Sequence, residues 1–383
     1  MHVSRLRCFF LVSALLAAPP TLSAQEGAPG TDPGFEPLFQ DSSLRGWSPV
    51  GNAGFTNKNG TVTCTGTGNY PSWLRSEQEF ENFILRFEFS LDRYSDGGIF
   101  FHAPKYGRNS RVGFEFQLSD DKRSLEPLLN SNGAIYGAVP PSKFAFKDFG
   151  IWNDAEITVD WPKFQAKING ETVQDLDLSK DPRLAHRFRS GFLGLQDRGN
   201  EYRLRNVRVQ RLPNSDKPWR TLFNGKDFTG WHEVKEGAKF TVDNGEILAE
   251  DGNGYLVTND KFTNFELRLY VKTKWLANGG VFIRWLGRDD RGDEIQVEDI
   301  PDSRNPTGSV YDRAHADDLP IQIGEWYPMQ IMVDGPNVTV RVNGKTVAHY
   351  DRLNVRAGHI ALQMHKRDSW IRFSDIQIQS WDK

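Results

Sequence analysis

The stretch Phe265-Glu266-Leu267-Arg268-Leu269-Tyr270-Val271-Lys272 alternates apolar and polar side chains along its whole length. This period of two is typical of a β-strand that buries one face in a core. Residues 338–342 repeat the alternation, and Asn343-Gly344 then supplies the residue types that a type I′ hairpin turn needs. No amphipathic pattern at helical spacing extends beyond two turns. The sequence therefore predicts an all-β chain of short paired strands.

The strand pattern occurs twice, because the chain contains two divergent copies of one unit. Asn82-Phe83-Ile84-Leu85-Arg86 returns as Asn264-Phe265-Glu266-Leu267-Arg268, and Asn169-Gly170 marks the earlier hairpin. Further matches keep the same order: Gly97-Gly98-Ile99-Phe100 with Gly279-Gly280-Val281-Phe282, Glu115-Phe116-Gln117 with Glu294-Ile295-Gln296, and Leu195-Gln196 with Leu362-Gln363. Copies of about 170 residues without helices predict two sandwiches or jelly rolls, and the pattern alone fits either topology. We expect the first copy at residues 35–212, a short proline-bracketed linker at 213–218, and the second copy at 219–383.

The N-terminus has the pattern of a cleavable export signal. Arg5 and Arg7 form a basic segment, residues 8–18 are apolar, and Leu22-Ser23-Ala24 offers small residues for cleavage. The apolar run is too short to span a bilayer, which needs roughly 20 residues. We expect residues 1–24 to be removed, residues 25–34 to be disordered, and the protein to be secreted or periplasmic with no membrane span.

Charge and aromatic content narrow the classes of partner. Lys and Arg number 47 against 50 Asp and Glu, so no net field favours nucleic acid or anionic lipid. Aromatic residues make up 12% of the chain, with 11 Trp and 26 Phe. Rings of this abundance suit sandwich cores, and they also suit sugar binding, where a ring stacks on a pyranose face. The sequence thus favours a carbohydrate partner and no nucleic acid, and it leaves the oligomeric state open.

One predicted strand in each copy gathers polar groups on one face. Glu294, Gln296 and Glu298 share a face in the second copy, and the apolar residues between them share the other. The first copy has Glu115 and Gln117 at the matching places. Carboxylates on such a strand are suited to acid/base chemistry on a sugar, and the alternative is a solvated outer sheet face.

Two strand ends add a cation and an imidazole to the second copy. Arg284 closes the strand that contains Phe282, and His365 follows Gln363. An arginine can bind a sugar oxygen or stabilise an enolate, and a histidine can move a proton near neutral pH. The alternative for each is a solvated strand end. His315, Asp317, Asp318, His365 and Glu294 are residue types that ligate metals, but no dense ligand motif is present, so no cofactor is required and a divalent metal is left open.

The ordered set of motifs resembles one family. Gly-Gly-Ile/Val-Phe, Glu-x-Gln-x-x-Asp, Gly-x-x-Tyr, Gly-Glu-Trp, Asn-Gly and Leu-Gln-x-His together are similar to the 3-keto-disaccharide hydrolase domain family. The resemblance covers both copies. It implies two tandem concanavalin-A-like jelly-roll β-sandwich domains, and activity on glycosides already oxidised at C3.

The resemblance also implies roles for individual residues. In the second copy, Glu294 or His365 would transfer protons and Arg284 would stabilise the oxyanion, while the residues that orient hydroxyls would be Gln296, Asp299, Tyr311 and Gln363. The first copy has His102 in place of Arg284 and Arg198 in place of His365. We therefore expect chemistry in the second copy, and substrate binding or a decayed site in the first, through Glu115, Gln117, Asp120, His102 and Arg198.

Two other functions remain open from the sequence. A non-catalytic carbohydrate-binding protein would have much the same aromatic-rich sandwich. A laminarinase-type glycoside hydrolase would carry Glu-x-Asp-x-x-Glu on the polar strand, but Gln117 and Gln296 stand in place of its middle carboxylate.

Overall fold

The computed structural model describes residues 32–69, 72–121, 124–214, 217–235, 237–287, 289, 292–300, 302–317 and 319–381. Within these ranges the chain is almost entirely β, with one helical turn, α1 (Asn109–Val112), and one 3₁₀ segment, η1 (Leu178–Lys180). None of the described helical segments has the length and apolar character needed to cross a bilayer. The predicted export signal lies outside the described residues.

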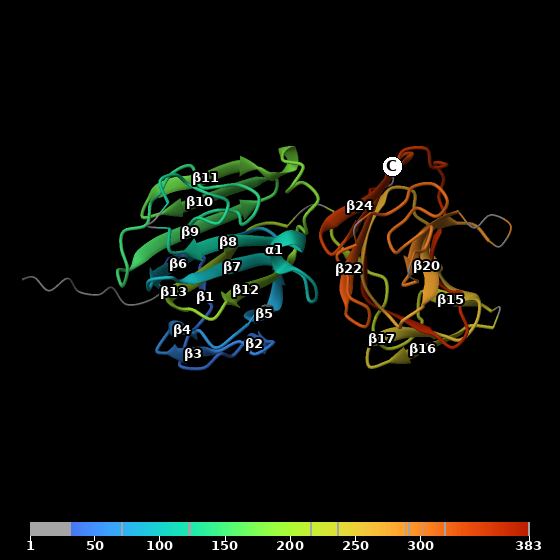
Figure 1. The fold of residues 1–383 in the computed structure, drawn as a ribbon, viewed down its shortest axis with the longest axis horizontal. Coiled ribbons are helices and arrows are strands. Elements are labelled where there is room, and N and C mark those ends of the chain that lie inside the picture. The colour runs from blue at the N-terminus through green and yellow to red at the C-terminus, as the bar shows by residue number, and fades with distance from the viewer. Residues whose placement is uncertain are drawn as a thin grey trace, which may run out of the picture.

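Each copy folds as its own two-sheet jelly-roll sandwich, which confirms the predicted fold class (Figure 1). The larger sheet of the first copy has the order β11 (Glu171–Asp177), β10 (Lys163–Ile168), β9 (Asn153–Asp160), β6 (Phe83–Leu91), β13 (Glu201–Arg211), β4 (Thr61–Thr65), β3 (Phe55–Lys58), with β1 (Glu36–Pro37) also on β13. Its five-stranded sheet has the order β2 (Trp47–Val50), β5 (Ser72–Phe80), β12 (Gly191–Asp197), β7 (Asp96–Ala103), β8 (Phe114–Ser119).

The second copy repeats this topology strand for strand. Its larger sheet has the order β16 (Lys239–Asp243), β17 (Glu246–Glu250), β26 (Trp370–Ser380), β19 (Phe265–Thr273), β22 (Tyr327–Asp334), β23 (Asn337–Val342), β24 (Lys345–Tyr350), with β14 (Arg220–Thr221) on β26. Its five-stranded sheet has the order β15 (Trp231–Lys235), β18 (Gly254–Thr258), β25 (His359–Met364), β20 (Asn278–Trp285), β21 (Asp293–Glu298). The shared strand order confirms the duplication.

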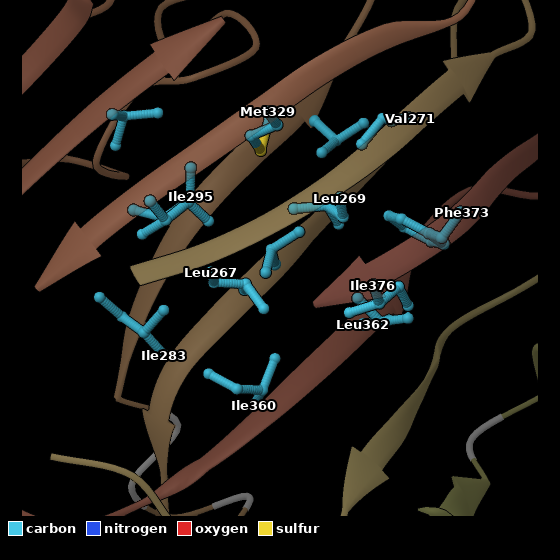
Figure 2. Close-up of a cluster of buried hydrophobic side chains, with 14 of the residues drawn as sticks. Leu267, Leu269, Val271, Ile283, Ile295, Met329, Ile360, Leu362, Phe373 and Ile376 are labelled. Atoms are coloured by element: carbon cyan, nitrogen blue, oxygen red, sulfur yellow. The ribbon is translucent and has the colours of Figure 1, made fainter. Parts of the chain in front are cut away.

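The core of the second copy lies between its two sheets. Leu267, Leu269 and Val271 of β19 point toward Ile283 and Ile295 of the five-stranded sheet, as Figure 2 shows. All five side chains are at most 1% exposed. Burial of such a side chain contributes roughly 1.5–3 kcal/mol, so the alternating strand that the sequence shows becomes one wall of the core.

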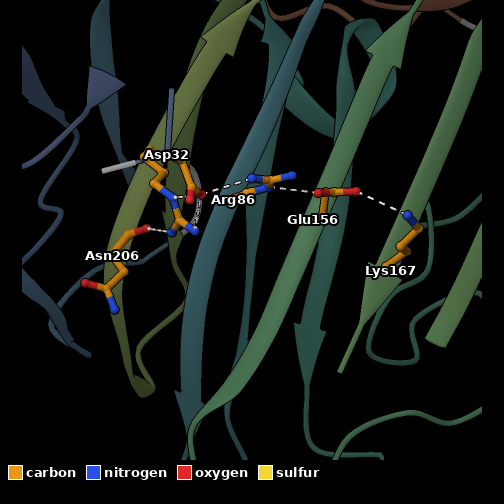
Figure 3. Close-up of polar contacts among 6 residues, drawn as sticks. Asp32, Arg86, Glu156, Lys167 and Asn206 are labelled. Atoms are coloured by element: carbon orange, nitrogen blue, oxygen red, sulfur yellow. Dashed lines mark hydrogen bonds and ion pairs between the residues drawn. The ribbon is translucent and has the colours of Figure 1, made fainter. Parts of the chain in front are cut away.

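Charged side chains form a ladder across the outer face of the larger sheet in the first copy (Figure 3). Arg86 of β6 bonds Asp32 at 3.0 Å and Glu156 of β9 at 2.8 Å, and Lys167 of β10 reaches Glu156 at 3.3 Å. Arg208 of β13 also bonds Asp32, at 2.9 Å. Residues 32–34 were expected to be disordered, and the two arginines instead attach Asp32 to the sheet.

The matching face of the second copy is covered by the first copy. Tyr106 stacks on Trp326 with ring centroids 5.5 Å apart, the Lys105 amide donates to the Tyr270 hydroxyl at 2.7 Å, and Phe188 packs on the Arg268 guanidinium at 4.2 Å. Consequently Glu266 and Arg268, the polar residues of the alternating strand, are only 5% and 4% exposed. The expectation of a half-buried strand is wrong for this face. The alternation of apolar and polar residues along one strand does not indicate whether another domain covers the polar side.

Candidate functional site

The candidate site lies on the face of each five-stranded sheet that is turned away from the core. In the second copy, β18, β25, β20 and β21 pair so that Tyr255 faces Gln363, Gln363 faces Gly280, and Gly280 faces Gln296. Side chains of a strand alternate between faces, and the neighbours of these residues, such as Leu362, belong to the core. The row of four therefore faces outward.

Two amide oxygens of this row, those of Gln296 and Gln363, have no hydrogen-bond partner within the described residues. Gln363 donates to the Tyr255 hydroxyl at 3.2 Å, and Gln296 donates to Asn278 Oδ1 at 3.3 Å. Both glutamines are 2% exposed, and their Oε1 atoms have no hydrogen-bond partner within the described residues. A buried oxygen without a partner costs about 1–3 kcal/mol, so this pair is suited to accept hydrogen bonds from a bound molecule.

The first copy reproduces the same arrangement. Gln196 pairs with Trp73, and Gln117 pairs with Gly98. Gln117 donates to Asp96 at 2.9 Å, and its Oε1 and that of Gln196 are again buried without a partner in the described chain. The two divergent copies therefore share a glutamine pair at matching places.

A glycine in each copy makes room for the neighbouring glutamate. A Cβ atom added to Gly98 would lie 2.9 Å from Glu115 Oε1, and one added to Gly280 would lie 2.5 Å from Glu294 Oε1. Real Cβ contacts are almost never this short, so the glutamate side chains lie directly across these glycines. This explains the Gly-Gly motif: its second glycine sets the position of the carboxylate.

Glu115 has the most perturbed carboxyl group of the first-copy site. It is 2% exposed, and burial raises its pKa from 4.5 to about 8, with a further rise from nearby Asp96. Arg198, the Ser110 hydroxyl and Arg108 act in the opposite direction on that pKa. A carboxyl group that titrates near neutral pH is suited to exchange protons with a substrate.

Aromatic side chains flank both polar rows. Tyr255, Phe282 and Trp285 form a cluster separate from the main core of the second copy, and Trp73 and Phe100 do so in the first. Each of these rings is at most 5% exposed. They pack against one another edge to face or tilted, beside the glutamine pairs.

Arg284 does not join this site, which corrects its expected role. Its side chain is fully buried, and it donates at 2.7–3.0 Å to three backbone carbonyl oxygens, those of Thr263, Asn354 and Gly335. The cause is a bulge near the end of β20, where Arg284 has φ = 53° and turns away from the outer face. The guanidinium therefore holds these loop segments together instead of lining the outer face with the glutamines.

His102, the first-copy counterpart of Arg284, is corrected in the same way. Its φ is 50°, and its ring nitrogens lie 3.0 and 2.7 Å from the carbonyl oxygens of Phe188 and Glu81. The ring is 1% exposed. His102 thus joins two segments of the first copy and is not available to a substrate.

His365 lies at the end of the row that contains Gln296. It is exposed directly after β25, and its amide donates to the carbonyl of Asn278 at 2.9 Å. In the first copy, Arg198 takes the same place and pairs with Asp96 at 3.5 Å. A titratable or charged side chain therefore stands at this end of the row in both copies.

Tyr311 approaches the row from a loop. It is 45% exposed, and its amide donates to the carbonyl of Glu294 at 2.9 Å. The structure thus brings five of the expected second-copy residues to one region: Glu294, Gln296, Gln363, Tyr311 and His365.

Two expected aspartates lie elsewhere, which corrects their predicted roles. The Thr273 hydroxyl of β19 donates to Asp299, so this carboxylate joins the two sheets of the second copy. Burial raises the pKa of Asp299 to about 6, with a contribution from Glu298. Asp120 accepts the backbone amide of Tyr94 at 3.1 Å and holds a loop. Both side chains have structural partners and lie beyond the row.

The described residues contain no cluster of three or more side chains able to hold a metal ion. His315 and Asp317 pair with each other at 3.2 Å. Asp318, the third residue of that candidate group, lies outside the described residues.

Several members of the site were not expected from the sequence. Gln196, Trp73 and Asp96 complete the first-copy row, and Tyr255 and Asn278 complete the second. A signal for some of them was present, because a polar residue precedes Gly-Gly and Leu-Gln recurs in both copies. No sequence pattern indicated that Trp73 and Tyr255 would occupy matching places.

Comparison with known proteins assigns the family. Residues 34–210 and 218–379 both match the 3-keto-alpha-glucoside-1,2-lyase-like domain family. The chain belongs to this family. The resemblance inferred from the motifs is therefore confirmed for both copies.

The relatives of this chain are distant. A 3-keto-disaccharide hydrolase from Bacteroides thetaiotaomicron is 23% identical over 228 residues, which covers 47% of this chain and 79% of the relative. Two crystal structures of candidate glycosyl hydrolases from Parabacteroides distasonis are 20% and 21% identical. They cover 47% and 46% of this chain and 95% and 99% of their own, with TM-scores of 0.41 and 0.42.

Proposed function

We propose that the protein cleaves glycosides whose sugar is oxidised at C3, and that it binds them on the outer faces of its five-stranded sheets. The observation that carries the proposal is the glutamine pair next to a glutamate, which occurs in both copies. The family assignment and the name of the Bacteroides thetaiotaomicron relative support the substrate class.

The chemistry follows from the ketone at C3. The ketone acidifies the hydrogen on C2, a base removes that proton, and the electrons form an enolate. The enolate then collapses to a C1–C2 double bond as the C1–oxygen bond breaks and the leaving oxygen takes up a proton. Water adds across the double bond, with its hydroxyl at C1 and its hydrogen at C2. Such a site needs a proton acceptor, a group that stabilises the enolate and a proton donor.

We assign the proton transfer to Glu115 of the first copy. Its pKa of about 8 makes it a stronger base than an ordinary carboxylate, while part of it is ionised at neutral pH. After it takes the proton from C2, the same carboxyl group can deliver it to the leaving oxygen. Arg198, positioned by Asp96 beside Gln117, supplies a positive charge for the enolate oxygen.

The second copy serves mainly as a binding site in this proposal. Glu294 and His365 lie in the region of Gln296. Arg284, the expected oxyanion partner, instead donates its hydrogen bonds to the backbone carbonyl oxygens of loops. Tyr255 and the glutamine pair remain suited to hold a sugar. This assignment reverses the sequence-based expectation that chemistry belongs to the second copy.

The test is turnover of a 3-keto-glucoside with a chromogenic aglycone, and of the unoxidised glucoside, by the purified protein. We expect release of the aglycone from the 3-keto compound alone. Glu115→Gln should lower the rate by about 10²-fold or more, and the matched Glu294→Gln should lower it much less. Binding without turnover by the wild type would favour a non-catalytic carbohydrate-binding protein. Cleavage of the unoxidised glucoside would favour a conventional glycosidase.

We also propose that the protein is exported, on the basis of the N-terminal sequence pattern. Mass spectrometry of the protein from its native host should give a mature N-terminus near Gln25. Recovery of a chain that retains Met1 would contradict export by cleavage.

A further inference from the structure

A cavity of about 140 Å³ lies between the two copies, apart from both glutamine pairs. Its walls come from β5, β7 and the segment before β12 in the first copy, and from β19 and β26 in the second. Phe192 lines the cavity, and it lies on β12 four residues from Gln196, which is about 13 Å along a strand. Ligand sites often form at the boundary between domains.

The floor of the cavity holds a buried arginine with an unused donor. Arg268 donates through Nε to Glu266 at 2.9 Å and through Nη1 to Ser190 at 3.5 Å. Its guanidinium lies between the rings of Phe188 and Trp219, at 4.2 and 3.8 Å, so its position is fixed. Nη2 is buried and has no partner in the described chain. An N–H donor buried in this way is costly unless a bound molecule accepts its hydrogen bond.

Two further polar groups line the same space. The Tyr270 hydroxyl accepts the Lys105 amide hydrogen, and no acceptor for its own proton lies among the described residues. The Glu79 carboxylate lines the cavity at its rim, where the residue is exposed, and it has no hydrogen-bond partner in the described part of the chain. The cavity therefore offers two donors and one acceptor to a ligand.

The charges around the cavity disfavour an anion. Arg268 is paired with Glu266, and Lys105 is paired with Asp375 at 3.0 Å. The two cations and two carboxylates that line the cavity therefore balance, and no net positive charge among them attracts an anion. Nε of Arg268 already donates to Glu266, so the edge of the guanidinium that combines Nε with an Nη atom is not free for a second carboxylate.

We propose that this cavity binds one ring of a neutral sugar through its hydroxyl groups. Hydroxyls both donate and accept, which matches Arg268, Tyr270 and Glu79, and the Phe192 ring supplies an apolar wall. A cavity of about 150 Å³ holds a molecule the size of benzene, so part of a pyranose ring enters and the rest stays in the mouth. The inference needs only carbohydrate binding and does not depend on turnover at Glu115.

Methyl glucoside is the probe, and its binding to the full-length protein is measured by calorimetry and ligand-observed NMR. A double variant, Gln196→Ala with Gln363→Ala, first removes one glutamine from each outer-face site. In this background, Ser190→Phe should fill the cavity and lower the remaining affinity by about tenfold or more, and Glu79→Ala should lower it by a similar factor. Glu77→Ala is the matched control, since this exposed carboxylate on the same strand bonds Ser48 and does not line the cavity.

Each outcome decides the proposal. Loss in both cavity variants with retention in Glu77→Ala supports it, provided that thermal unfolding shows each variant folded. Absence of residual binding in the double variant overturns it, and so does residual binding that Ser190→Phe leaves unchanged. Glycine is tested in parallel, and binding of glycine but not of the glucoside would overturn the proposal in favour of a zwitterionic ligand.

Discussion

Asn343 of the second copy accepts a hydrogen bond from the backbone amide of Arg108 in the first copy, with Asn343 Oδ1 and Arg108 N 2.8 Å apart. Asn343 is part of the hairpin turn between β23 and β24, and Arg108 immediately precedes α1. Ser110 of α1 hydrogen-bonds to Glu115, and Arg108 acts on the same carboxyl group. A turn of one copy thus supports the segment that covers the perturbed glutamate of the other.

Removal of this support should change the pH dependence of activity. Asn343→Gly keeps the positive φ of the turn and removes the acceptor, so the segment before α1 loses its anchor. Water then reaches Glu115 more easily, and the pKa of Glu115 falls toward its ordinary range. The variant also loses the bond from Asn343 Nδ2 to the carbonyl of Pro320, so the two lost hydrogen bonds should cost about 2 kcal/mol of stability.

The measurement for this variant is kcat/KM against pH. Asn337→Ala is the control, because Asn337 lies on β23 and its side chain bonds Asp334 of its own copy. An unchanged profile in Asn343→Gly would show that the contact does not act on Glu115.

The activity of the wild type should rise with pH and level off above about 8. Glu115 must be ionised to accept the proton from C2, and burial raises its pKa to about 8. Turnover of a 3-keto-glucoside across the range from about pH 6 to 9 measures this rise in activity. The Glu294→Gln variant should show the same dependence on pH as the wild type. A flat profile across that range would exclude Glu115 as the proton acceptor.

The same pKa predicts how stability depends on pH. Protonated Glu115 is favoured in the folded state, so its contribution is fully present below 4.5 and is lost as pH rises through about 8. The loss is on the order of 5 kcal/mol, from about 1.4 kcal/mol for each pKa unit. Glu115→Gln should therefore be more stable than the wild type in alkaline solution and similar to it in mild acid. Urea unfolding at several pH values measures the difference, with Glu77→Gln as a control that should keep the wild-type dependence.

Arg284 should contribute to the stability of the second copy and not to turnover. Arg284→Met leaves three buried carbonyl oxygens without their donor, and we expect a loss of about 3 kcal/mol in the stability of the second copy. Thermal unfolding measures the loss, and Arg304→Met at an exposed arginine should show none. Turnover by the folded fraction should remain unchanged. A variant with wild-type stability and no turnover would instead place Arg284 at the substrate.

Replacement of Gln363 should raise the stability of the protein and lower its affinity for sugar. Gln363→Met removes a buried oxygen that has no partner in the described chain, so the ligand-free protein should gain up to about 1 kcal/mol. Sugar affinity at the second copy should fall, because the methionine accepts no comparable hydrogen bond. Gln174→Met is the control: Gln174 donates to three backbone carbonyls, and its loss should destabilise the protein. Destabilisation by both variants would mean that Gln363 contributes to the fold alone.

The fold was predictable because its signals are local. The alternation in Phe265–Thr273 and the Asn-Gly turns describe short-range geometry, and Asn169 and Asn343 indeed have the positive φ values, 51° and 47°, that such turns need. The order of repeated motifs then predicted two copies of one topology.

The candidate site was predictable only in part, since it depends on register and on contacts between copies. Glu115 and Glu294 were found from strand alternation, but the role of Arg284 changed because a single bulge turned its side chain to the other side. The raised pKa of Glu115 arises from burial under a segment that the strand pattern does not include, so no spacing of residues reveals it.

The contact between the copies joins two different surfaces, a loop-rich end of the first copy and a sheet face of the second. Because the two surfaces differ, the contact is not closed by symmetry. The loop-rich end of another molecule can therefore dock in the same way on the equivalent sheet face of the first copy, unless something opposes it. There the counterpart of Arg268 is Arg86, which stands with Asp32 and Glu156 in the partly exposed ladder. Another unit docking on that face would have to remove water from these charges, at a cost of several kcal/mol for each ion. We therefore expect the ladder to oppose such docking, and its replacement by apolar residues to favour head-to-tail association between molecules, which sedimentation would measure.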